Sequence, residues 1–231
     1  MNPRIVLFDI ETSPNLAYVW GKWEQDVIEF EREWDLLCWT VKELGGKSRT
    51  LALCDVKNEE VLVKELWKEL DSADIIIAHN GDGFDLPKSN TKFLEYRLPP
   101  PSPYKTVDTL KVARSRFAFN SNKLDDLAKF LGLERKLENG GFKTWMGCLK
   151  GDKKAWGLMK KYNAKDCTVL EQIYHLMKPW MNNHPDLSVM TQELVCPSCG
   201  SDKVIKRAKR DIFYKKKARM SCNDCGRWFR I

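Results

Sequence analysis

The sequence predicts an α/β domain with a mixed sheet flanked by helices, followed by a small C-terminal β unit. Three observations support this fold class. Residues Arg4–Ile10 and Asp74–Ala78 are short apolar runs of the kind that form buried strands. Several strand patterns precede a region in which strands alternate with helices, which is typical of a mixed sheet. Two Cys-x-x-Cys pairs lie close to the C-terminus, where they predict a metal-stabilised unit.

The elements follow in a clear order along the chain. After the strand Arg4–Ile10, apolar residues and turn signals predict strands at Ala17–Trp20, Leu36–Leu44 and Arg49–Val56. Residues Leu44–Lys47 contain two glycines and predict a hairpin turn. Apolar residues at helical spacing predict helices at Glu59–Ala73, Leu86–Leu98, Thr109–Ala118, Lys123–Leu131, Lys153–Asn163 and Ala164–Met177.

Prolines mark two breaks between these segments. Pro99–Pro103 contains four prolines and predicts a rigid loop. Pro185 and the polar residues around it predict a linker near residue 188. We therefore expect two domains, at residues 1–187 and 191–231.

Composition and charge limit the class of protein. The chain has 231 residues, of which 43% are hydrophobic and 31% charged, so it is long and apolar enough for one well-cored domain plus a small second one. Its formal net charge is +7, and all of this excess lies in residues 191–231. The basic segment is either a solvated tail or a surface for a polyanion such as nucleic acid.

Hydropathy and cysteine usage predict where the protein works. The apolar runs are far shorter than the roughly 20 residues of a membrane span, and carboxylates interrupt the N-terminal one. We therefore expect no membrane partner and no signal peptide. These features predict an intracellular, cytoplasmic protein whose cysteines are thiols or metal ligands, and we expect it to be a monomer.

The two cysteine pairs predict one structural zinc ion. The four cysteines are Cys196, Cys199, Cys222 and Cys225. Two dozen residues separate the pairs, and a glycine follows each pair, where it permits a positive φ. Four thiolates leave no open coordination position, so the zinc stabilises the fold instead of catalysing a reaction. The alternatives are a redox pair or unpaired thiols, but a redox Cys-x-x-Cys normally occurs once.

This segment resembles a zinc ribbon, in which a β-hairpin joins two metal-binding turns. Basic residues between the pairs alternate with apolar and aromatic ones, a composition that suits phosphate contact and base stacking. The candidate nucleic-acid contacts are Lys206, Arg207, Lys209, Arg210, Lys215, Lys216 and Lys217. The alternative is that aromatic residues such as Trp228 and Phe229 fill a small core.

Carboxylates at three places in the first domain predict a second kind of metal site. Asp9 and Glu11 lie at positions i and i+2 of a strand, so both point to one face, where two anions need a neutralising cation. Asp85 opens the helix that follows the strand Asp74–Ala78. It competes with Asp82, and we prefer Asp85 because Phe84 can anchor it against the core. For Asp9 and Glu11 the alternative is a solvated strand end.

The third place combines a tyrosine with a carboxylate. Tyr162 and Asp166 lie at positions i and i+4 of a predicted helix and share a face. Carboxylate oxygens are the ligands that Mg²⁺ and Mn²⁺ prefer. Four carboxylates from two strand ends and one late helix can hold two such ions about 3.5–4 Å apart, which suits displacement at a phosphodiester.

The order of these motifs is similar to that of a known superfamily. Phe8–Thr12, Asn80–Asp85 and Tyr162–Asp166 resemble, in this order, the three motifs of the DEDD 3′–5′ exonucleases, which have a ribonuclease-H-like fold. The tyrosine implies the Y-type (DEDDy) branch, which includes the proofreading domains of family A and family B DNA polymerases. The wider pattern resembles stand-alone, phage-type exonucleases of the family-B-polymerase-like group and implies a phage or bacterial origin. The segments that share this pattern are His79–Gly81, Val107–Leu110, Ser121–Leu124 and Tyr162–Asn163. The resemblance covers residues 4–187.

The resemblance implies a role for each motif residue. Asp9, Glu11 and Asp166 would bind the first of two Mg²⁺ or Mn²⁺ ions, and Asp9 with Asp85 the second. Tyr162 would orient or help to deprotonate the attacking water.

The substrate end of the site is also implied by the resemblance, since Thr12 and Asn80 occupy positions that contact the terminal nucleotide. The predicted function is a two-metal-ion 3′–5′ exonuclease acting on DNA, with single-stranded or frayed ends favoured, in replication or repair. A replication or repair protein is a further expected partner, and DNA is favoured over RNA. The alternatives are a non-catalytic nucleic-acid-binding or polymerase-adaptor protein, and a structure-specific nuclease or RNA exonuclease on the same fold.

Overall fold

The structure is a computed structural model that describes residues 3–23, 26–134, 140–182, 184–191, 193–212 and 215–231, with the side chains of 208–212 and 215–217 left out. Its centre is a five-stranded sheet in the order β5-β4-β1-β6-β7. The strands are β1 (Ile5–Thr12), β4 (Leu36–Glu43), β5 (Ser48–Ala52), β6 (Ile75–Ala78) and β7 (Lys105–Asp108). β1 pairs antiparallel with β4 and parallel with β6, so the predicted mixed sheet is confirmed.

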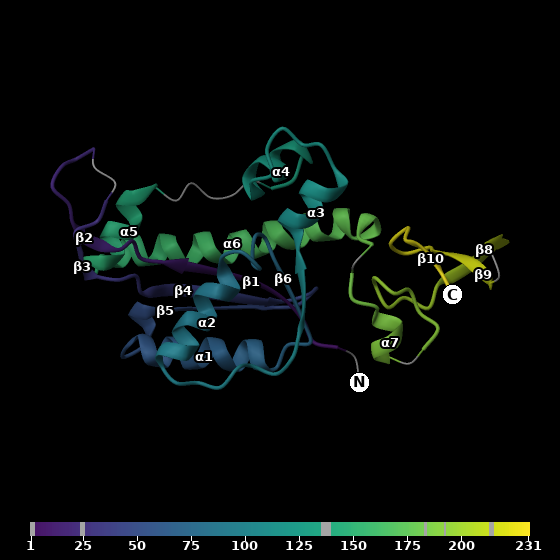
Figure 1. Cartoon of the computed structure of the whole chain (residues 1–231), viewed down its shortest axis with the longest axis horizontal. Coiled ribbons are helices and arrows are strands. Elements are labelled where there is room, and N and C mark those ends of the chain that lie inside the picture. Colours follow the sequence, from purple (N-terminus) through teal and green to yellow (C-terminus); the bar gives the residue numbers. More distant parts are fainter. Residues whose placement is uncertain (1–2, 24–25, 135–139, 183, 192, 213–214) are drawn as a thin grey trace.

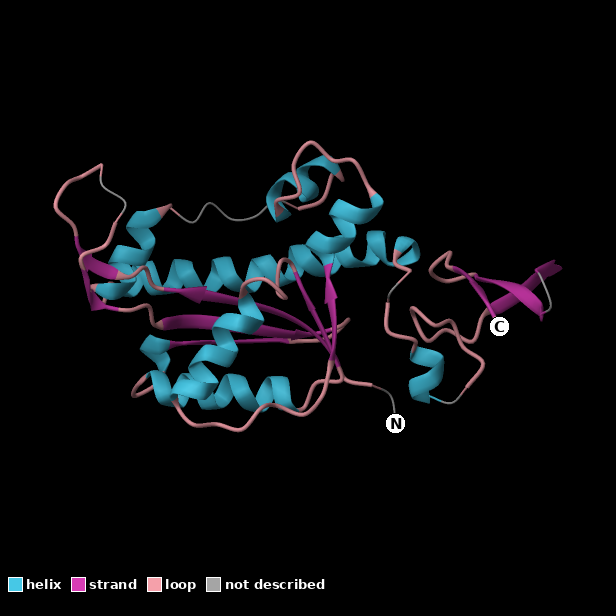
Figure 2. Ribbon diagram, in the orientation of Figure 1, coloured by secondary structure: helices cyan, strands magenta, loops and turns pink. Residues whose placement is uncertain are grey.

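Helices cover both faces of this sheet, as Figures 1 and 2 show. They are α1 (Glu59–Asp71), α2 (Asp85–Glu95), α3 (Thr109–Arg116), α4 (Leu124–Phe130), α5 (Phe142–Leu149) and α6 (Lys153–Met177). None of the helices in the described ranges combines the length and apolar character that a membrane span requires.

The alternation of side chains along β1 divides the core into two layers. Val6, Phe8 and Ile10 pack with residues of α1 and α2 on one face. Leu7 packs on the opposite face with residues of α3, α4 and α6. Successive side chains of a strand point to opposite faces, so the odd-numbered residues of β1 look toward α6. Asp9 and Glu11 belong to this odd-numbered set.

The long helix α6 differs from the sequence prediction. The periodicity suggested two helices that meet at residue 163, whereas the structure has one helix of 25 residues. Asp152 caps its N-terminus by accepting a hydrogen bond from the N–H of Lys154 (2.9 Å). The junction carries no proline or glycine, and Asn163 is fully buried there, so nothing interrupts the backbone ladder.

The elements β7, β3 and α5 escaped the sequence prediction because each is short or exposed. β7 begins with exposed residues at the sheet edge, and β3 (Glu29–Arg32) is exposed along its whole length. α5 has eight residues and an internal glycine. The predicted strand Arg49–Val56 stops at Ala52, because a 3₁₀ turn, η1 (Leu53–Asp55), follows it.

The C-terminal part of the described chain is a three-stranded antiparallel sheet in the order β10-β9-β8. Its strands are β8 (Val204–Ile212), β9 (Lys215–Cys222) and β10 (Trp228–Arg230), and they lie beyond the C-terminal end of α6 (Figure 1). The segment predicted to be a linker contains the turn η2 (Lys178–Trp180) and the helix α7 (Leu187–Thr191). Leu187 is buried in the same core layer as Leu7, so this segment packs against the first domain.

Candidate active site

β1 and α6 bring three carboxylates together. Asp9 and Glu11 point toward α6 from the end of β1, and Asp166 meets them from the middle of α6, where it is almost fully buried. A carboxylate oxygen of each residue lies within 4.8 Å of one from each of the other two. Like charges this close repel, and a bound cation offsets the repulsion. An all-oxygen donor set of this kind fits Mg²⁺ or Mn²⁺, so the cluster is a possible metal site.

Asn163 adds a contact to this cluster that sequence reasoning did not assign. Its Nδ2 donates a hydrogen bond to Oδ2 of Asp9 (2.6 Å), and the side chain is fully buried. Its Oδ1 has no hydrogen-bond partner among the described residues. Asn163 precedes Asp166 by three residues and therefore lies on the same helix face. This spacing was the available signal, because an amide beside a carboxylate motif can orient it.

Asp85 lies against the backbone of the same strand. It begins α2, and its Oδ1 accepts a hydrogen bond from the N–H of Ile10 (3.1 Å), the residue between Asp9 and Glu11. Burial raises the pKa of the Asp85 carboxyl to about 7, while the hydrogen bond from Ile10 acts in the opposite direction. Asp85 is not one of the three carboxylates that meet within 4.8 Å. Its place at a second ion stays a prediction.

The predicted anchoring of Asp85 by Phe84 against the core is wrong. Phe84 was expected to anchor Asp85 against the core, but its side chain is 40% exposed. The hydrogen bond from the β1 backbone holds Asp85 instead. Asp82 forms a surface ion pair with Lys111 (2.6 Å) and is not among the three clustered carboxylates.

The two residues expected at the terminal nucleotide lie at neighbouring strand ends. Thr12 is the last residue of β1, and Asn80 follows β6, which pairs with β1. Asn80 has a left-handed backbone (φ 68°), and its N–H donates to Oδ1 of Asp108 (2.9 Å). The same oxygen of Asp108 accepts the N–H of Leu110 and caps α3. Asp108 thus fixes the turn that carries Asn80.

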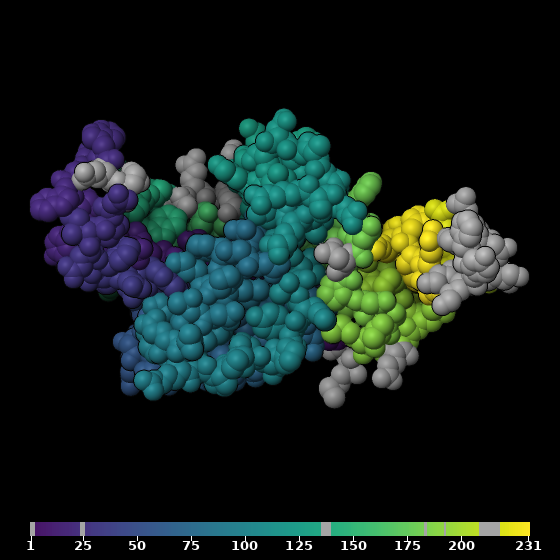
Figure 3. Space-filling view, in the orientation of Figure 1, coloured from purple at the N-terminus to yellow at the C-terminus, as the bar shows by residue number. Residues whose placement is uncertain are grey.

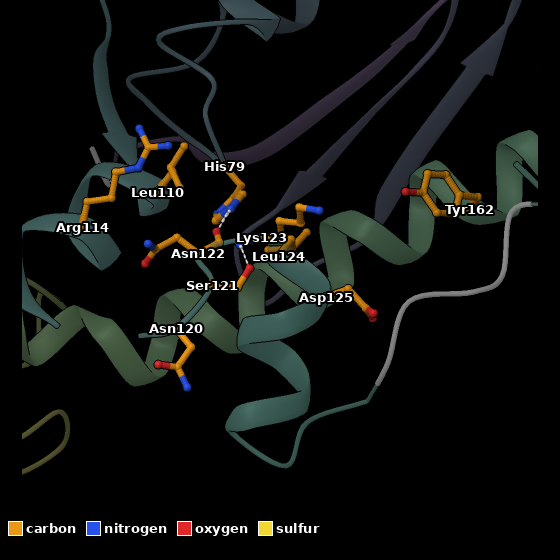
Figure 4. A pocket seen from close by; sticks show the side chains of 10 residues that line it. All are labelled: His79, Leu110, Arg114, Asn120, Ser121, Asn122, Lys123, Leu124, Asp125 and Tyr162. Carbon is orange, nitrogen blue, oxygen red and sulfur yellow. Dashed lines mark hydrogen bonds between the residues drawn. The ribbon is translucent and has the colours of Figure 1, made fainter. Parts of the chain in front are cut away.

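A pocket of about 630 Å³ lies beside the β6 end of this site. It is lined by polar residues of α3, of the segment before α4, and by Tyr162 of α6; Figure 4 shows Tyr162 standing apart from the others. His79 connects two segments of the pocket wall. Its Nδ1 lies 2.9 Å from Oγ1 of Thr109, and its Nε2 lies 2.9 Å from the carbonyl oxygen of Asn122. Arg114 on α3 gives the pocket a cationic wall.

Comparison with known proteins identifies the family of this chain. Residues 6–178 match the model of the RNase_H superfamily. The chain belongs to the RNase_H superfamily. Membership supports a nuclease-type enzyme that acts on nucleic acid. No curated protein matches the sequence.

Among solved structures, the RNase_H domain resembles part of a larger protein. The structure of the family B DNA polymerase from the hyperthermophilic archaeon Pyrobaculum calidifontis superposes with a TM-score of 0.54 at 15% sequence identity. The match covers 78% of this chain and 26% of the polymerase chain, so this chain spans about a quarter of that polymerase. At this identity the likeness shows a shared fold.

The four cysteines that follow the RNase_H domain form a second possible metal site. One sulfur from each of Cys196, Cys199, Cys222 and Cys225 lies within 4.8 Å of the other three. The sulfur–sulfur distances of 3.6 Å across the two turns are far longer than a disulfide bond. They are close to the edge of about 3.8 Å in a zinc–thiolate tetrahedron with bonds near 2.3 Å. The glycine after each pair has a positive φ, as expected.

The structure describes the side chains of two of the predicted nucleic-acid contacts on the C-terminal sheet. Lys206 and Arg207 lie on β8, and Nε of Arg207 donates to Oγ of Ser221 on β9 (2.8 Å). Trp228 is half exposed, and the Arg219 guanidinium lies 4.4 Å from the centre of its ring. The side chains of the other candidates fall outside the described part; these are Lys209, Arg210, Lys215, Lys216 and Lys217.

Proposed function

We propose that the chain is a metal-dependent 3′–5′ exonuclease of the DEDDy type that hydrolyses nucleotides from the 3′ end of DNA. The observation that carries the proposal is the meeting of Asp9, Glu11 and Asp166 within 4.8 Å in an RNase_H superfamily domain. The order of the three motifs along the chain, with a tyrosine four residues before Asp166, supports the direction of hydrolysis and the branch. Single-stranded or frayed ends are favoured, in replication or repair.

Each residue of the site has a task in this proposal. Asp9, Glu11 and Asp166 hold one Mg²⁺ or Mn²⁺ ion, and Asp9 with Asp85 holds a second. When bound, the two ions supply charge stabilisation at the attacking and leaving oxygens of a phosphodiester. Tyr162 orients the attacking water from the pocket side.

Two further contacts prepare the reacting groups. The amide of Asn163 fixes one oxygen of Asp9, so the carboxylate is oriented before substrate binds. Thr12 and Asn80, at adjacent strand ends, contact the terminal nucleotide. The polar pocket beside Asn80 receives the strand that leads to the cut.

The test is a cleavage assay with 5′-labelled single-stranded DNA and RNA of one sequence, each with Mg²⁺, Mn²⁺ or chelator. We expect a metal-dependent ladder that shortens from the 3′ end, with DNA cut faster than RNA. Asp9→Ala/Glu11→Ala should abolish it. Glu60→Gln, which removes an exposed carboxylate paired with Lys64 on α1, should not.

Three results would favour the alternatives. Binding of either polymer without hydrolysis under every metal condition would point to a non-catalytic binding or adaptor protein. Cleavage of circular single-stranded DNA would point to an endonuclease or structure-specific nuclease. Faster cleavage of RNA would make the protein an RNA exonuclease.

We further propose that the four cysteines bind one structural Zn²⁺ and that the C-terminal sheet is a zinc ribbon that grips nucleic acid. The sulfur geometry supports the metal, and exposed Lys206 and Arg207 beside the Arg219–Trp228 pair support the grip. Lys206→Ala should weaken binding of all sequences equally and reduce the slope of log affinity against log salt by about 1. An unchanged slope would assign the sheet to a protein partner.

A further inference from the structure

An arm rich in aromatic residues projects from the molecule between β1 and β4. We call residues 16–23 and 26–32 the aromatic arm; it contains β2 (Leu16–Tyr18) and β3, paired antiparallel. Trp20 is 86% exposed and Trp23 is 84% exposed. Other apolar side chains of the arm that face solvent are Leu16, Tyr18, Val19, Val27, Ile28 and Phe30. This concentration of exposed apolar surface indicates a binding surface.

The base of the aromatic arm is fixed at the carboxylate cluster. The N–H of Ser13 donates to the carbonyl oxygen of Asp35, and the N–H of Asp35 donates to Oγ of Ser13, both at 2.8 Å. Ser13 follows Thr12, the end of the strand that carries Glu11. Figures 1 and 3 show the arm standing out from that end of the molecule, opposite the C-terminal sheet.

The length of chain limits how far the tip can lie from the cluster. Trp20 follows Glu11 by nine residues, so the backbone cannot separate them by more than about 30 Å. A strand held at the carboxylates can therefore reach the arm. The arm therefore differs from an unrelated surface patch, because its backbone continues directly from the proposed site.

A cation lies beside the exposed aromatic rings in the first half of the arm. Residues 16–23 include Lys22 and no acidic residue, and Nζ of Lys22 lies 5.3 Å from the centre of the Trp23 ring. Exposed aromatic rings beside a cation are the combination that binds single strands, in which bases stack and phosphates meet the charge. Four acidic residues follow Trp23 in the sequence of this segment, Glu24, Asp26, Glu29 and Glu31, and they repel phosphates. Contact with the strand is therefore confined to the rings of Trp20 and Trp23 and to Lys22.

We propose that Trp20 and Trp23 stack on bases of the nucleic-acid strand whose end is bound at the carboxylate cluster. This inference rests on the proposed nuclease function and adds a base-binding surface to it. Because every base has an aromatic face, the arm tolerates any sequence. It acts on affinity for the strand, since the arm contributes no group to the carboxylate cluster.

The experiment compares two oligonucleotides of equal length, one of thymidines and one of abasic sites, by fluorescence anisotropy. The full chain carries Asp166→Asn throughout, which prevents cleavage. Trp20→Ala/Trp23→Ala should weaken binding of the thymidine strand about ten-fold or more and leave binding of the abasic strand unchanged. Trp20→Phe/Trp23→Phe should retain most of the affinity. Trp180→Ala, which removes an exposed tryptophan beyond the other end of α6, should change neither.

Several results would overturn the inference. An unchanged affinity for the thymidine strand would mean that the arm does not contact bases, and its apolar surface would then belong to a protein partner. Equal losses on both oligonucleotides would mean that the variants act through phosphate contacts or through the fold, which thermal unfolding of each variant checks. If wild-type protein cleaves DNA while the arm variants bind normally, this inference alone fails. If wild type neither binds nor cleaves, the proposed function fails.

Discussion

At the scale of single residues, the site depends on how one carboxylate is oriented. Asp9 is shared between both proposed ions, and Asn163 is the residue that holds its Oδ2. A carboxylate that is free to rotate loses affinity for a metal because orienting it then consumes part of the binding energy. Asn163 therefore acts as a positioning residue, although it need not touch metal or substrate.

Replacing this amide should separate positioning from binding. We expect Asn163→Ala to lower kcat and the affinity for Mn²⁺ about 10–100-fold with little change in KM for DNA. Steady-state kinetics and metal titrations measure the two effects. Lys161→Ala, an exposed change on the same helix, is the control. A rise in KM with unchanged kcat would contradict the positioning role.

A second residue-scale prediction concerns His184, which lies outside the active site. Its Nδ1 lies 2.7 Å from the carbonyl oxygen of Pro185, to which it donates, and its Nε2 lies 2.7 Å from the Tyr174 hydroxyl, from which the neutral ring accepts a hydrogen bond. Burial is the main cause that lowers the pKa of His184 to about 4. Unfolded histidine has a pKa near 6.5.

The unfolded chain therefore binds the extra proton first as the pH falls. The neutral His184 ring thus contributes its full stabilisation of the folded state above about pH 6.5. This stabilisation is lost as the pH falls toward 4. After allowance for partial solvent screening, we expect a loss of about 1–2 kcal/mol. Urea unfolding at several pH values should show a weaker pH dependence in His184→Phe than in wild type. Parallel curves for the two proteins would contradict this.

At the scale of elements, α6 connects chemistry to packing. Its 25 residues span about 37 Å, and its middle presents Asn163 and Asp166 to β1 while its C-terminal turns pack near Leu187, which precedes the C-terminal sheet. Both functional side chains keep their spacing only if the helix is continuous between them. The uninterrupted helix is therefore a condition for the site.

Breaking α6 between these residues should disturb stability and activity together. Ala164→Pro removes a backbone donor and clashes with the preceding turn, so we expect a loss of about 3 kcal/mol or more in the free energy of unfolding, and loss of cleavage. Ala164→Ser, with a helix-propensity cost of about 0.5 kcal/mol, should be nearly silent. Chemical unfolding and the exonuclease assay measure both. Retained cleavage in the proline variant would show that the two halves of α6 act independently.

At the scale of the whole molecule, the C-terminal sheet is attached to the RNase_H domain by specific contacts. The N–H of Leu187 donates to the carbonyl oxygen of Pro197 (2.9 Å), and Nη1 of Arg227 donates to that of Pro179 (3.1 Å). Lys178 is buried beside the cysteines; burial lowers the pKa of its ammonium, and the nearby sulfurs oppose this. Binding of the proposed metal at the four cysteines should therefore affect residues 178–187.

Loss of the proposed zinc tests this coupling. We expect one zinc per chain in wild type and none in Cys199→Ser/Cys222→Ser, measured by elemental analysis. Hydrogen exchange should then speed up in β8–β10 and also in residues 178–187, while β1 stays protected. Cys54→Ser changes an exposed cysteine outside the cluster and should keep the zinc. Exchange confined to residues 195–231 would show that the two parts are uncoupled.

Much of the fold could be predicted because it follows from local patterns. The runs that became β1 and β6 are apolar throughout their buried length, and α1 repeats leucine at every fourth position. β3 and β7 lack such a signal, since exposed residues alternate little between apolar and polar. The prediction of two helices that meet at residue 163 is wrong for a related reason. A polar asparagine in a helical pattern usually marks a helix end, whereas Asn163 is fully buried in the middle of α6.

The chemical groups that the protein possesses follow from the amino-acid sequence, because motif order, strand alternation and cysteine spacing are properties of the chain. Which of those groups meet depends on how the elements pack. Asp166 lies 155 residues beyond Glu11, and packing of α6 on the odd-numbered face of β1 brings them together. The same packing made Asn163 a partner of Asp9 and left Trp20 in solvent. Contacts between distant residues depend on how faces stack, and no local pattern encodes that.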